Sequence, residues 1–345
     1  MKILVVNNMV PFVRGGAEEL ADHLVRHLRR AGHDADLMRI PFAWDPADRL
    51  YDEMISCLNM ELWNVDRVIA LKFPAYLIPH PNKTMWLVHQ FRQAYDLWDS
   101  DYSLIPHSDS GTRLRDAIRA ADNECFASVN GFYCISPTVQ QRLRQFNQMD
   151  CQVLYHPLND PENFQCQSYG DYIFAGGRIN EGKRQHLLVE AMQHVTSDAK
   201  LIVAGPPETK RDAERLQRIV KQHNLQDKVQ LELGLLPRER IANLATNALA
   251  CAYIPFDEDS LAYVTMESCE AKKLVLSASD AGGVLGLVND GETGFVSPPT
   301  AEELADRIDR IFTDRAKSIR MGEASYANWR DKDINWKNTI QKLAA

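Results

Sequence analysis

The clearest signal of the fold lies in Ala248-Leu-Ala-Cys-Ala-Tyr-Ile254-Pro-Phe-Asp-Glu-Asp259-Ser-Leu-Ala-Tyr-Val-Thr-Met-Glu267-Ser-Cys-Glu-Ala-Lys-Lys-Leu-Val275. It begins with an apolar run over 248–254, which is typical of a buried parallel strand. A turn rich in carboxylates follows, and the next segment, about 262–273, is predicted to be a helix. A strand, a turn and a helix in this order indicate one repeat of a doubly wound parallel sheet.

Two carboxylates bracket the start of the predicted helix, Asp259 in the turn and Glu267 eight positions later. Ligands of open α/β sheets bind beyond the carboxyl ends of the strands, where the free N–H groups of a helix also favour phosphate. Carboxylates at that edge can accept hydrogen bonds from sugar hydroxyls. The alternative is that Asp259 and Ser260 only cap the helix and that Glu267 is a solvated helix residue.

The same alternation of strand and helix extends through the second half of the chain. Apolar runs predict strands at 171–175, 200–204, 229–233 and 274–277, and helical periodicity predicts helices near 210–223, 237–246 and 300–312. A glycine turn follows the first of these strands, with Gly177, Arg178 and Lys183 close together. Cations and backbone N–H groups beside a diphosphate would neutralise a nucleotide leaving group, so the edge is predicted to bind a nucleotide sugar.

The first half starts the pattern independently. Strands are predicted at 3–6, 34–40, 66–71, 84–89, 130–135 and 152–155. Gly15 and Gly16 precede the first helix, but they lack the G-x-G-x-x-G spacing of dinucleotide sites, so a nicotinamide or flavin cofactor is not indicated. His89 ends one of the strands and is therefore expected at the binding edge.

Two domains follow from these two series, since 345 residues suffice for two cores. We expect Rossmann-like domains at 1–162 and 168–325, with Pro161–Gly170 as the linker. An apolar stripe of Trp336, Ile340 and Leu343 predicts a final helix over 328–345 that packs on another part of the chain.

The composition excludes several classes of protein. A net charge of −8 argues against non-specific nucleic-acid binding, and no run reaches the roughly 20 apolar residues of a membrane span. Seven cysteines without regular spacing favour reduced thiols in the cytoplasm, and the short N-terminal apolar run is unlike a signal peptide. Arginines on three predicted helices could together contact anionic lipid if they share one face of the first domain. The alternative is that they lie on separate helix faces that contact only solvent. These arginines are Arg26, Arg29, Arg30, Arg113, Arg115, Arg119, Arg142 and Arg144.

In the residues named above, the chain resembles the retaining glycosyltransferases of family 4. These enzymes belong to the glycosyl transferases group 1 and have the GT-B fold. The resemblance covers nearly the whole chain and is strongest from Tyr172 to Pro298. Gly177, Arg178 and Lys183 match the family's G-R-x-x-x-x-K element, and Asp259 and Glu267 match its E-x7-E element. The family's G-G-A-E opening, donor-site histidine and later glycine-rich stretch are matched by Gly15–Glu18, His89 and Gly283–Gly294.

The resemblance implies a hexosyltransferase that moves a sugar from a UDP- or GDP-sugar, with retention and without a metal or other cofactor, to a saccharide or lipid-linked acceptor of a surface glycan. The first domain would bind the acceptor, the second would bind the donor, and the final helix would pack back on the first domain. Arg178 and Lys183 would hold the diphosphate, and Glu267 would bind the ribose diol. The remaining expected contacts are Asp259 and His89 to the donor sugar, Leu235 to the base, the amides of Tyr263 and Val264 to the phosphate and sugar, and a close backbone approach at Gly15, Gly16 and Gly177.

Three departures from the family pattern bear on activity. The first acid is Asp259 instead of glutamate, the segment from Ser260 to Tyr263 lacks the family's glycines, and Gly286 stands where the family has a later glutamate. Three alternatives therefore remain open. They are a nucleotide-sugar epimerase of the same fold, a non-catalytic nucleotide-sugar binder, and a metal-dependent transferase of another fold using Asp99-x-Asp101 or Asp257-x-Asp259.

Overall fold

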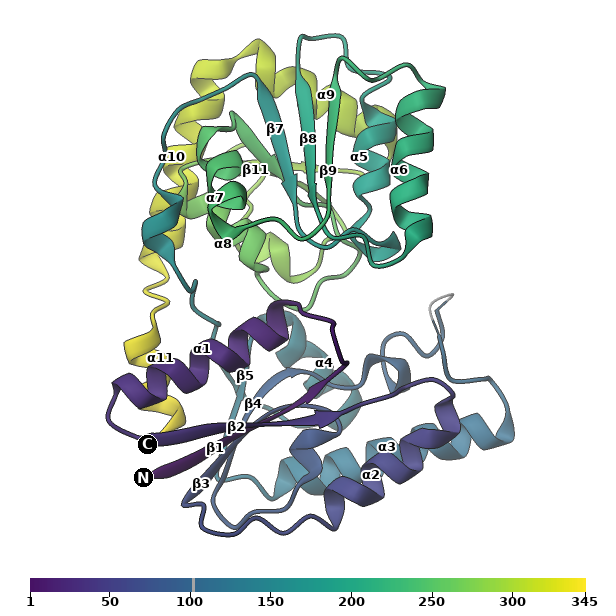
Figure 1. Cartoon of the computed structure of the whole chain (residues 1–345), viewed down its shortest axis with the longest axis vertical. Helices are drawn as coiled ribbons and strands as arrows, with labels where there is room; N and C mark the ends of the chain where they lie inside the picture. Colours follow the sequence, from purple (N-terminus) through teal and green to yellow (C-terminus); the bar gives the residue numbers. More distant parts are fainter. Residues whose placement is uncertain (101–102) are drawn as a thin grey trace. The chain divides into compact units, whose positions relative to one another are not determined.

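The structure is a computed structural model that describes residues 1–100 and 103–345. The chain divides into two compact units (Figure 1). The first unit consists of Met1–Pro157 together with Ile334–Ala345, and the second unit is Leu158–Asp333. Each unit contains a sheet of six parallel strands with flanking helices, as the two series of apolar runs predict.

The first unit has the strand order β2-β1-β3-β4-β5-β6. Its strands are β1 (Lys2–Met9), β2 (Asp34–Pro41), β3 (Arg67–Lys72), β4 (Lys83–His89), β5 (Gly131–Cys134) and β6 (Gln152–Val153). Its helices are α1 (Gly16–Arg30), α2 (Leu50–Leu58), α3 (Asp109–Ala127), α4 (Pro137–Asn147) and α11 (Trp336–Leu343), and short 3-10 helices occupy Ala47–Arg49, Ala75–Leu77 and Arg92–Ala94. Helix α1 covers one face of the sheet, and α2 and α3 cover the other (Figure 1).

Helix α11 belongs to the core of the first unit although it ends the chain. Trp336 and Leu343 are buried in the same apolar cluster as Leu24 and Leu28 of α1. The indole of Trp336 stacks on the ring of His27, with 4.6 Å between ring centroids. The stripe seen in the sequence is therefore the face through which α11 packs on α1.

The second unit has the strand order β12-β11-β10-β7-β8-β9. Its strands are β7 (Tyr172–Gly176), β8 (Lys200–Gly205), β9 (Val229–Leu233), β10 (Ala250–Ala252), β11 (Leu274–Ala278) and β12 (Gly294–Ser297). Its helices are α5 (Gln185–Ala191), α6 (Lys210–Gln222), α7 (Arg238–Asn247), α8 (Tyr263–Glu270), α9 (Ala301–Thr313) and α10 (Arg315–Asp331), with 3-10 turns at Pro161–Phe164, Glu181–Lys183 and Gly283–Gly286. Helices α5 and α6 lie on one side of the sheet, and α7 and α8 on the other (Figure 1).

The strand order places a switch point in the middle of the second sheet. From β7 the chain proceeds through β8 to the edge strand β9, and then returns to the other side of β7 as β10. Loops that leave β7 and β10 therefore diverge from the same edge in opposite directions. Ligands of doubly wound sheets bind in the crevice that such a divergence opens.

Three boundaries expected from the sequence are wrong. The segment Pro161–Gly170 is no free linker, because Phe164 is fully buried in the core of the second unit. A single helix over 328–345 is not formed, since α10 ends at Asp331 and only α11 joins the first unit. Strand β10 is shorter than the apolar run 248–254, although residues on both sides of it are also buried. Asp101, one half of the Asp99-x-Asp101 pair, lies outside the described residues.

Candidate nucleotide-sugar site

The candidate site in the second unit is built at the switch point between β7 and β10. Strand β7 ends at Gly176, and Gly177 takes a φ of +114°, a conformation that glycine adopts readily. A Cβ at Gly177 would lie 3.6 Å from a methyl carbon of Val264, in the first turn of α8. The turn after β7 and the start of the helix after β10, which the sequence pattern expected at one edge, are thus neighbours.

Lys183 follows that turn and is held by residues of the segment that follows β10. Its ε-amine donates to Oε2 of Glu258 and lies 5.4 Å from the centre of the Tyr253 ring. The hydroxyl of Tyr253 donates to the same carboxylate oxygen at 2.9 Å. Burial opposes the charge on Lys183, but the Glu258 carboxylate and Tyr253 outweigh it, so the pKa of Lys183 is raised. The edge therefore presents a permanent cation.

Arg184 ties the loop after β7 to the ends of two other strands. Its guanidinium donates to the backbone carbonyls of Ile254 and Pro255 at 2.8 and 2.7 Å. It also forms a bidentate ion pair with Asp280, at 2.9 and 2.6 Å. No role for Arg184 was predicted from the sequence. Its position next to Lys183 was the only hint in the sequence that it belongs to the site. Its partners could not be predicted, because they are 70 or more residues away in the chain.

The acidic loop after β10 is held by the glycine turn after β11. The N–H groups of Asp257 and Glu258 donate to the carbonyls of Asp280 and Ala281, at 2.8 and 3.2 Å. A Cβ at Gly282, whose φ is +65°, would lie 2.5 Å from the carbonyl oxygen of Glu258. Only a residue without a side chain allows this approach, and the turn thereby fixes the loop that carries Glu258 and Asp259.

Helix α8 begins at Tyr263 without a side-chain cap. Its N-cap residue is Ala262, which makes no capping hydrogen bond. Ser260 instead accepts from the N–H of Ala262 at 3.1 Å, one residue before the helix starts. The hydroxyl of Ser260 therefore binds the residue before the helix and not an N–H of the first turn. Asp259 is 8% exposed and lies in the loop that leads into this uncapped helix start.

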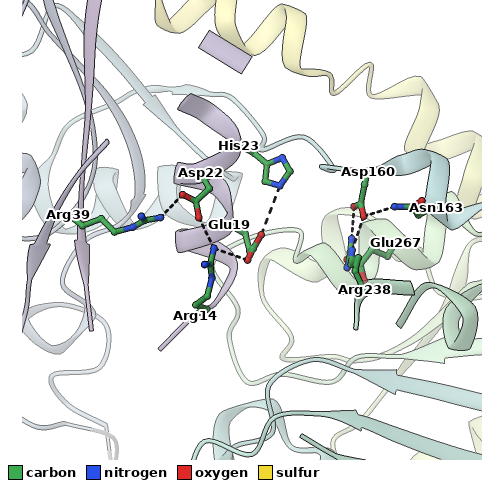
Figure 2. A network of polar contacts seen from close by, with 9 residues as sticks. All are labelled: Arg14, Glu19, Asp22, His23, Arg39, Asp160, Asn163, Arg238 and Glu267. Carbon is green, nitrogen blue, oxygen red and sulfur yellow. Dashed lines mark hydrogen bonds and ion pairs between the residues drawn. The ribbon is translucent and has the colours of Figure 1, made fainter. Parts of the chain in front are cut away.

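Glu267 is buried on α8 and forms an ion pair with Arg238 of α7 (Figure 2). Nη1 of Arg238 lies 2.6 Å from Oε1 of Glu267. The same guanidinium donates to both carboxylate oxygens of Asp160, at 2.8 and 2.6 Å. The alternative of a solvated Glu267 is wrong, because its side chain is 4% exposed. Arg238 and Asp160 were missed by the sequence analysis, and no local pattern connects them to Glu267.

Two further predicted contacts lie at the carboxyl ends of strands β7 and β9 of the same sheet. Arg178, next to Gly177, lies 3.7 Å from the carboxylate of Glu208, which follows β8. Leu235 follows β9 and is 86% exposed. An exposed apolar side chain beside the binding edge is consistent with a contact to a flat base, which stays a prediction.

Gly15, Gly16 and His89 belong to the first unit. Gly15 is the N-cap of α1 with an extended φ of −154°, so its conformation does not require glycine. Nδ1 of His89, at the end of β4, lies 2.6 Å from the backbone carbonyl of Gln90. A carbonyl accepts only from a protonated Nδ1, which leaves Nε2 of the neutral ring as an acceptor.

Arg14 connects the loop before Gly15 to α1 (Figure 2). Its guanidinium lies 2.6 Å from one carboxylate oxygen of Asp22, and that of Arg39 lies 2.7 Å from the other. Glu19 is a further partner of Arg14, at 3.5 Å. This network positions the glycine-containing turn at the carboxyl end of β1.

The arginines that left a membrane contact open largely have partners within the first unit. Arg29 and Arg119 donate to backbone carbonyls, and Arg115, Arg142 and Arg144 pair with aspartates. In the part of the chain that the structure describes, no helix is long and apolar enough to cross a membrane. All seven cysteines are free thiols.

Among residues 1–100 and 103–345, no three His, Cys, Asp or Glu side chains are grouped so that they could hold a metal ion. Metal-independent turnover stays a prediction.

Comparison with protein families gives a match to the second unit. Residues 162–328 match the family described as Glycosyl transferases group 1. The second unit therefore contains a domain of this group, as the resemblance of Tyr172–Pro298 indicated.

Curated relatives are glycosyltransferases by name. An alpha-D-kanosaminyltransferase of Streptomyces kanamyceticus is 30% identical over 151 residues, 43% of this chain and 38% of that protein. An N-acetylgalactosamine-N,N'-diacetylbacillosaminyl-diphospho-undecaprenol 4-alpha-N-acetylgalactosaminyltransferase of Campylobacter jejuni is 28% identical over 154 residues, 42% of this chain and 40% of that protein. The matches thus span well under half of the length of these relatives.

Solved structures match both units. The sucrose-phosphate synthase of Thermosynechococcus elongatus has a TM-score of 0.78 and 18% identity, covering 99% of this chain and 97% of that one. Anabaena Alr3699/HepE, solved with UDP and glucose, has a TM-score of 0.74 and 15% identity, covering 100% of this chain and 98% of that one. The chain therefore has the GT-B fold, and the predicted fold class is confirmed.

Proposed function

We propose that this chain is a retaining glycosyltransferase of family 4 that transfers a sugar from a nucleotide diphosphate sugar to a saccharide or lipid-linked acceptor. The observation that carries the proposal is the convergence at one switch point of the cation Lys183, the uncapped start of α8 and the buried carboxylate Glu267. These groups match a diphosphate and a ribose diol, which are the constant parts of such a donor.

The diphosphate would bind between the turn after β7 and the first turn of α8. Lys183 and Arg178 supply positive charge. The backbone N–H groups of Tyr263 and Val264 lie at the N-terminus of α8, where anions are stabilised. Glu267 would accept hydrogen bonds from the ribose hydroxyls, and Asp259 would accept from the donor sugar. Leu235 would contact the base, and His89 of the first unit would contact the donor sugar.

The reaction would break the bond between the anomeric carbon and the leaving phosphate oxygen while the acceptor oxygen attacks the same face of the sugar. The acceptor proton would pass to a phosphate oxygen, so that the leaving group serves as the base. Lys183 and Arg178 would stabilise the charge that develops on the diphosphate. No residue of the chain need carry the sugar covalently, and no metal is expected in this step.

Uridine diphosphate sugars are the first donors to test, because the Anabaena protein of the same fold was solved with UDP and glucose. A lipid-linked acceptor finds support in the diphospho-undecaprenol of the Campylobacter relative's name. Peripheral contact with a membrane draws no added support from the structure, since three of the arginines it depended on, Arg115, Arg142 and Arg144, pair with aspartates of their own unit.

A panel of UDP-, GDP- and dTDP-sugars tests the proposal by thermal shift and by nucleotide release, with and without EDTA. We expect one sugar nucleotide to raise the melting temperature and to turn over in EDTA, and Lys183→Ala and Glu267→Ala to abolish turnover. The anomeric configuration of the product, read by NMR, tests retention. Binding without turnover in the presence of candidate acceptors would favour a non-catalytic binder, and no binding by any member would contradict the proposal.

A further inference from the structure

Arg238 is fixed by contacts on three sides. Its guanidinium forms the bidentate pair with Asp160 and the single contact with Glu267 described above. Its plane lies over the ring of Phe164, with 4.6 Å between the guanidinium carbon and the ring centre. Asp160 is itself held by the side-chain amide of Asn163, at 3.0 Å (Figure 2). The orientation of the guanidinium toward Glu267 is thus determined by the segment that opens the second unit.

We propose that Arg238 is a positioning residue that holds Glu267 in the ionised form needed to accept the hydrogen bonds of a ribose diol. This inference rests on the proposed function, in which Glu267 binds the ribose. One nitrogen of the Arg238 guanidinium contacts an oxygen of Glu267, and the other two nitrogens donate to Asp160. Arg238 therefore cannot move toward a bound ligand without breaking its pair with Asp160.

The charges around Glu267 explain why it needs such a neighbour. Facing it are Arg238 from α7, Asp160 from the segment before the 3-10 turn Pro161–Phe164, and Cys251 from β10. Burial raises the pKa of Glu267, Arg238 lowers it part of the way back, and Asp160 raises it. Without Arg238, burial and Asp160 would both raise the pKa of Glu267, and nothing named here would oppose them.

Protonation changes what Glu267 can recognise. An ionised carboxylate accepts from both hydroxyls of a ribose, whereas a carboxylic acid loses part of that acceptor capacity. A site that hydrogen-bonds a hydroxyl rejects analogues that lack it, because its buried polar group is then left without a partner. Arg238 is therefore expected to control the preference for a ribose over a 2′,3′-dideoxyribose, and to control it in a pH-dependent way.

The test measures the ratio of the dissociation constant of a 2′,3′-dideoxynucleoside diphosphate to that of the matching ribonucleotide, from pH 6 to pH 9 by calorimetry. UDP, GDP and ADP are the ribonucleotide probes. Taking the ratio cancels the ionisation of the phosphates, which both ligands share. The variant is Arg238→Gln, and the matched control is Arg240→Gln, because Arg240 lies on the same helix, is 43% exposed against 44% for Arg238, and pairs with Glu232.

For the unaltered chain and Arg240→Gln we expect a ratio of about 100, which falls only at a lower pH than in Arg238→Gln. For Arg238→Gln we expect a ratio below about 3 at pH 6, rising by roughly tenfold per pH unit until Glu267 ionises. A ratio in Arg238→Gln that matches the control at every pH overturns the inference and leaves the proposed function intact. Failure of the unaltered chain to bind any of the three ribonucleotides overturns the inference, and the proposed function is then decided by the dTDP-sugars of the donor panel.

Asp160→Asn keeps the inference testable if Arg238→Gln does not fold. It removes the charge that raises the pKa of Glu267 while Arg238 keeps its contact with that carboxylate. We expect its ratio to stay at or above that of the unaltered chain at pH 6. A fall at pH 6 to the level below about 3 expected for Arg238→Gln would show that the pair only holds the loop in place, and would overturn the inference.

Discussion

The ε-amine of Lys183 and the carboxylate of Glu258 are hydrogen-bonded to each other across the switch point between β7 and β10. The hydroxyl of Tyr253 donates to the same oxygen of Glu258 at 2.9 Å. Because Tyr253 holds the carboxylate independently, Glu258 keeps a partner when Lys183 turns to another anion. Lys183, the cation proposed to bind the diphosphate, is thus already paired with the carboxylate of Glu258. A bound diphosphate would have to share Lys183 with that carboxylate.

Replacing this counterion should strengthen nucleotide binding. We expect Glu258→Gln to lower the dissociation constant of the preferred nucleoside diphosphate by about tenfold, roughly 1.4 kcal/mol, because a negative charge beside the phosphates is removed. Calorimetric titration at low ionic strength measures the change. Glu208→Gln is the control, since Glu208 lies 3.7 Å from Arg178 and its side chain is 45% exposed. Solvent screening should hold its effect to less than about twofold. A weaker affinity in Glu258→Gln would mean that Glu258 helps to bind the donor.

Gly282 should be intolerant of any side chain. In addition to the carbonyl contact described above, a Cβ there would lie 2.7 Å from the backbone nitrogen of Glu258. We expect Gly282→Ala to destabilise the chain by roughly 3 kcal/mol and to weaken nucleotide binding, because the loop that carries Glu258 and Asp259 must move. The melting temperature and the nucleotide affinity report the two effects.

Gly291→Ala measures the cost of the positive φ without the steric clash that an added Cβ meets at Gly282. Gly291 has a similar φ of +77° but no heavy atom within 4 Å of an added Cβ. Its substitution should cost about 1 kcal/mol through backbone strain alone and leave nucleotide affinity unchanged. Equal losses in Gly282→Ala and Gly291→Ala would show that the close approach to Glu258 contributes little.

The features that could be predicted from the sequence are those in which neighbouring residues carry the signal. Apolar runs and helical periodicity are local, so the alternation that builds both sheets is visible without a structure. The carboxyl end of each strand is also local, which is why Gly177, Lys183 and Asp259 were expected at one edge. The short helix α11 was recognised from its stripe, but its separation from α10 was missed, although Asn335 caps α11 by accepting from the N–H of Asn338.

The pairs that organise the site could not be predicted, because their members are distant in the sequence. Lys183 and Glu258 are 75 positions apart, and Arg238 and Asp160 are 78 apart. Charged residues are common in turns, and only the fold selects which of them meet. The burial of Glu267 was missed for the same reason, since α8 packs against α7, α10 and the 3-10 turn Pro161–Phe164 as well as against the sheet.

Ala262 stands where the resemblance expects a glycine, and the structure shows the consequence. Its φ is +57°, which strains any residue with a side chain. We expect Ala262→Gly to raise the free energy of unfolding by about 1 kcal/mol. Ala242→Gly is the matched control, because Ala242 is 6% exposed against 7% for Ala262 but lies in helix α7. There glycine should cost about 1 kcal/mol. Denaturant titration of both variants gives the sign of each change in the free energy of unfolding. A loss of stability in Ala262→Gly would show that the backbone at Ala262 is not strained.

Asp122 makes the stability of the first unit depend on pH. It is fully buried on α3, and the hydroxyls of Tyr76 and Tyr95 donate to its two oxygens at 2.9 and 2.8 Å. Burial raises the pKa of Asp122 from 3.8 to about 7, and the two hydroxyls offset only part of that effect. Between these values the folded chain keeps a proton that the unfolded chain has released, so stability falls as the pH rises.

Asp122→Asn should remove this dependence, because an amide does not titrate. From pH 5 to pH 8 we expect the unaltered chain to lose roughly 3 kcal/mol more than the variant, at about 1.4 kcal/mol for each pH unit up to the folded pKa. Urea titrations at both pH values, followed by tryptophan fluorescence, measure the difference. Asp116→Asn serves as the control, since Asp116 lies on the same helix, is 60% exposed and pairs with Arg115. It should retain the slope of the unaltered chain. An Asp122→Asn variant with that same slope would assign the pH dependence to other groups.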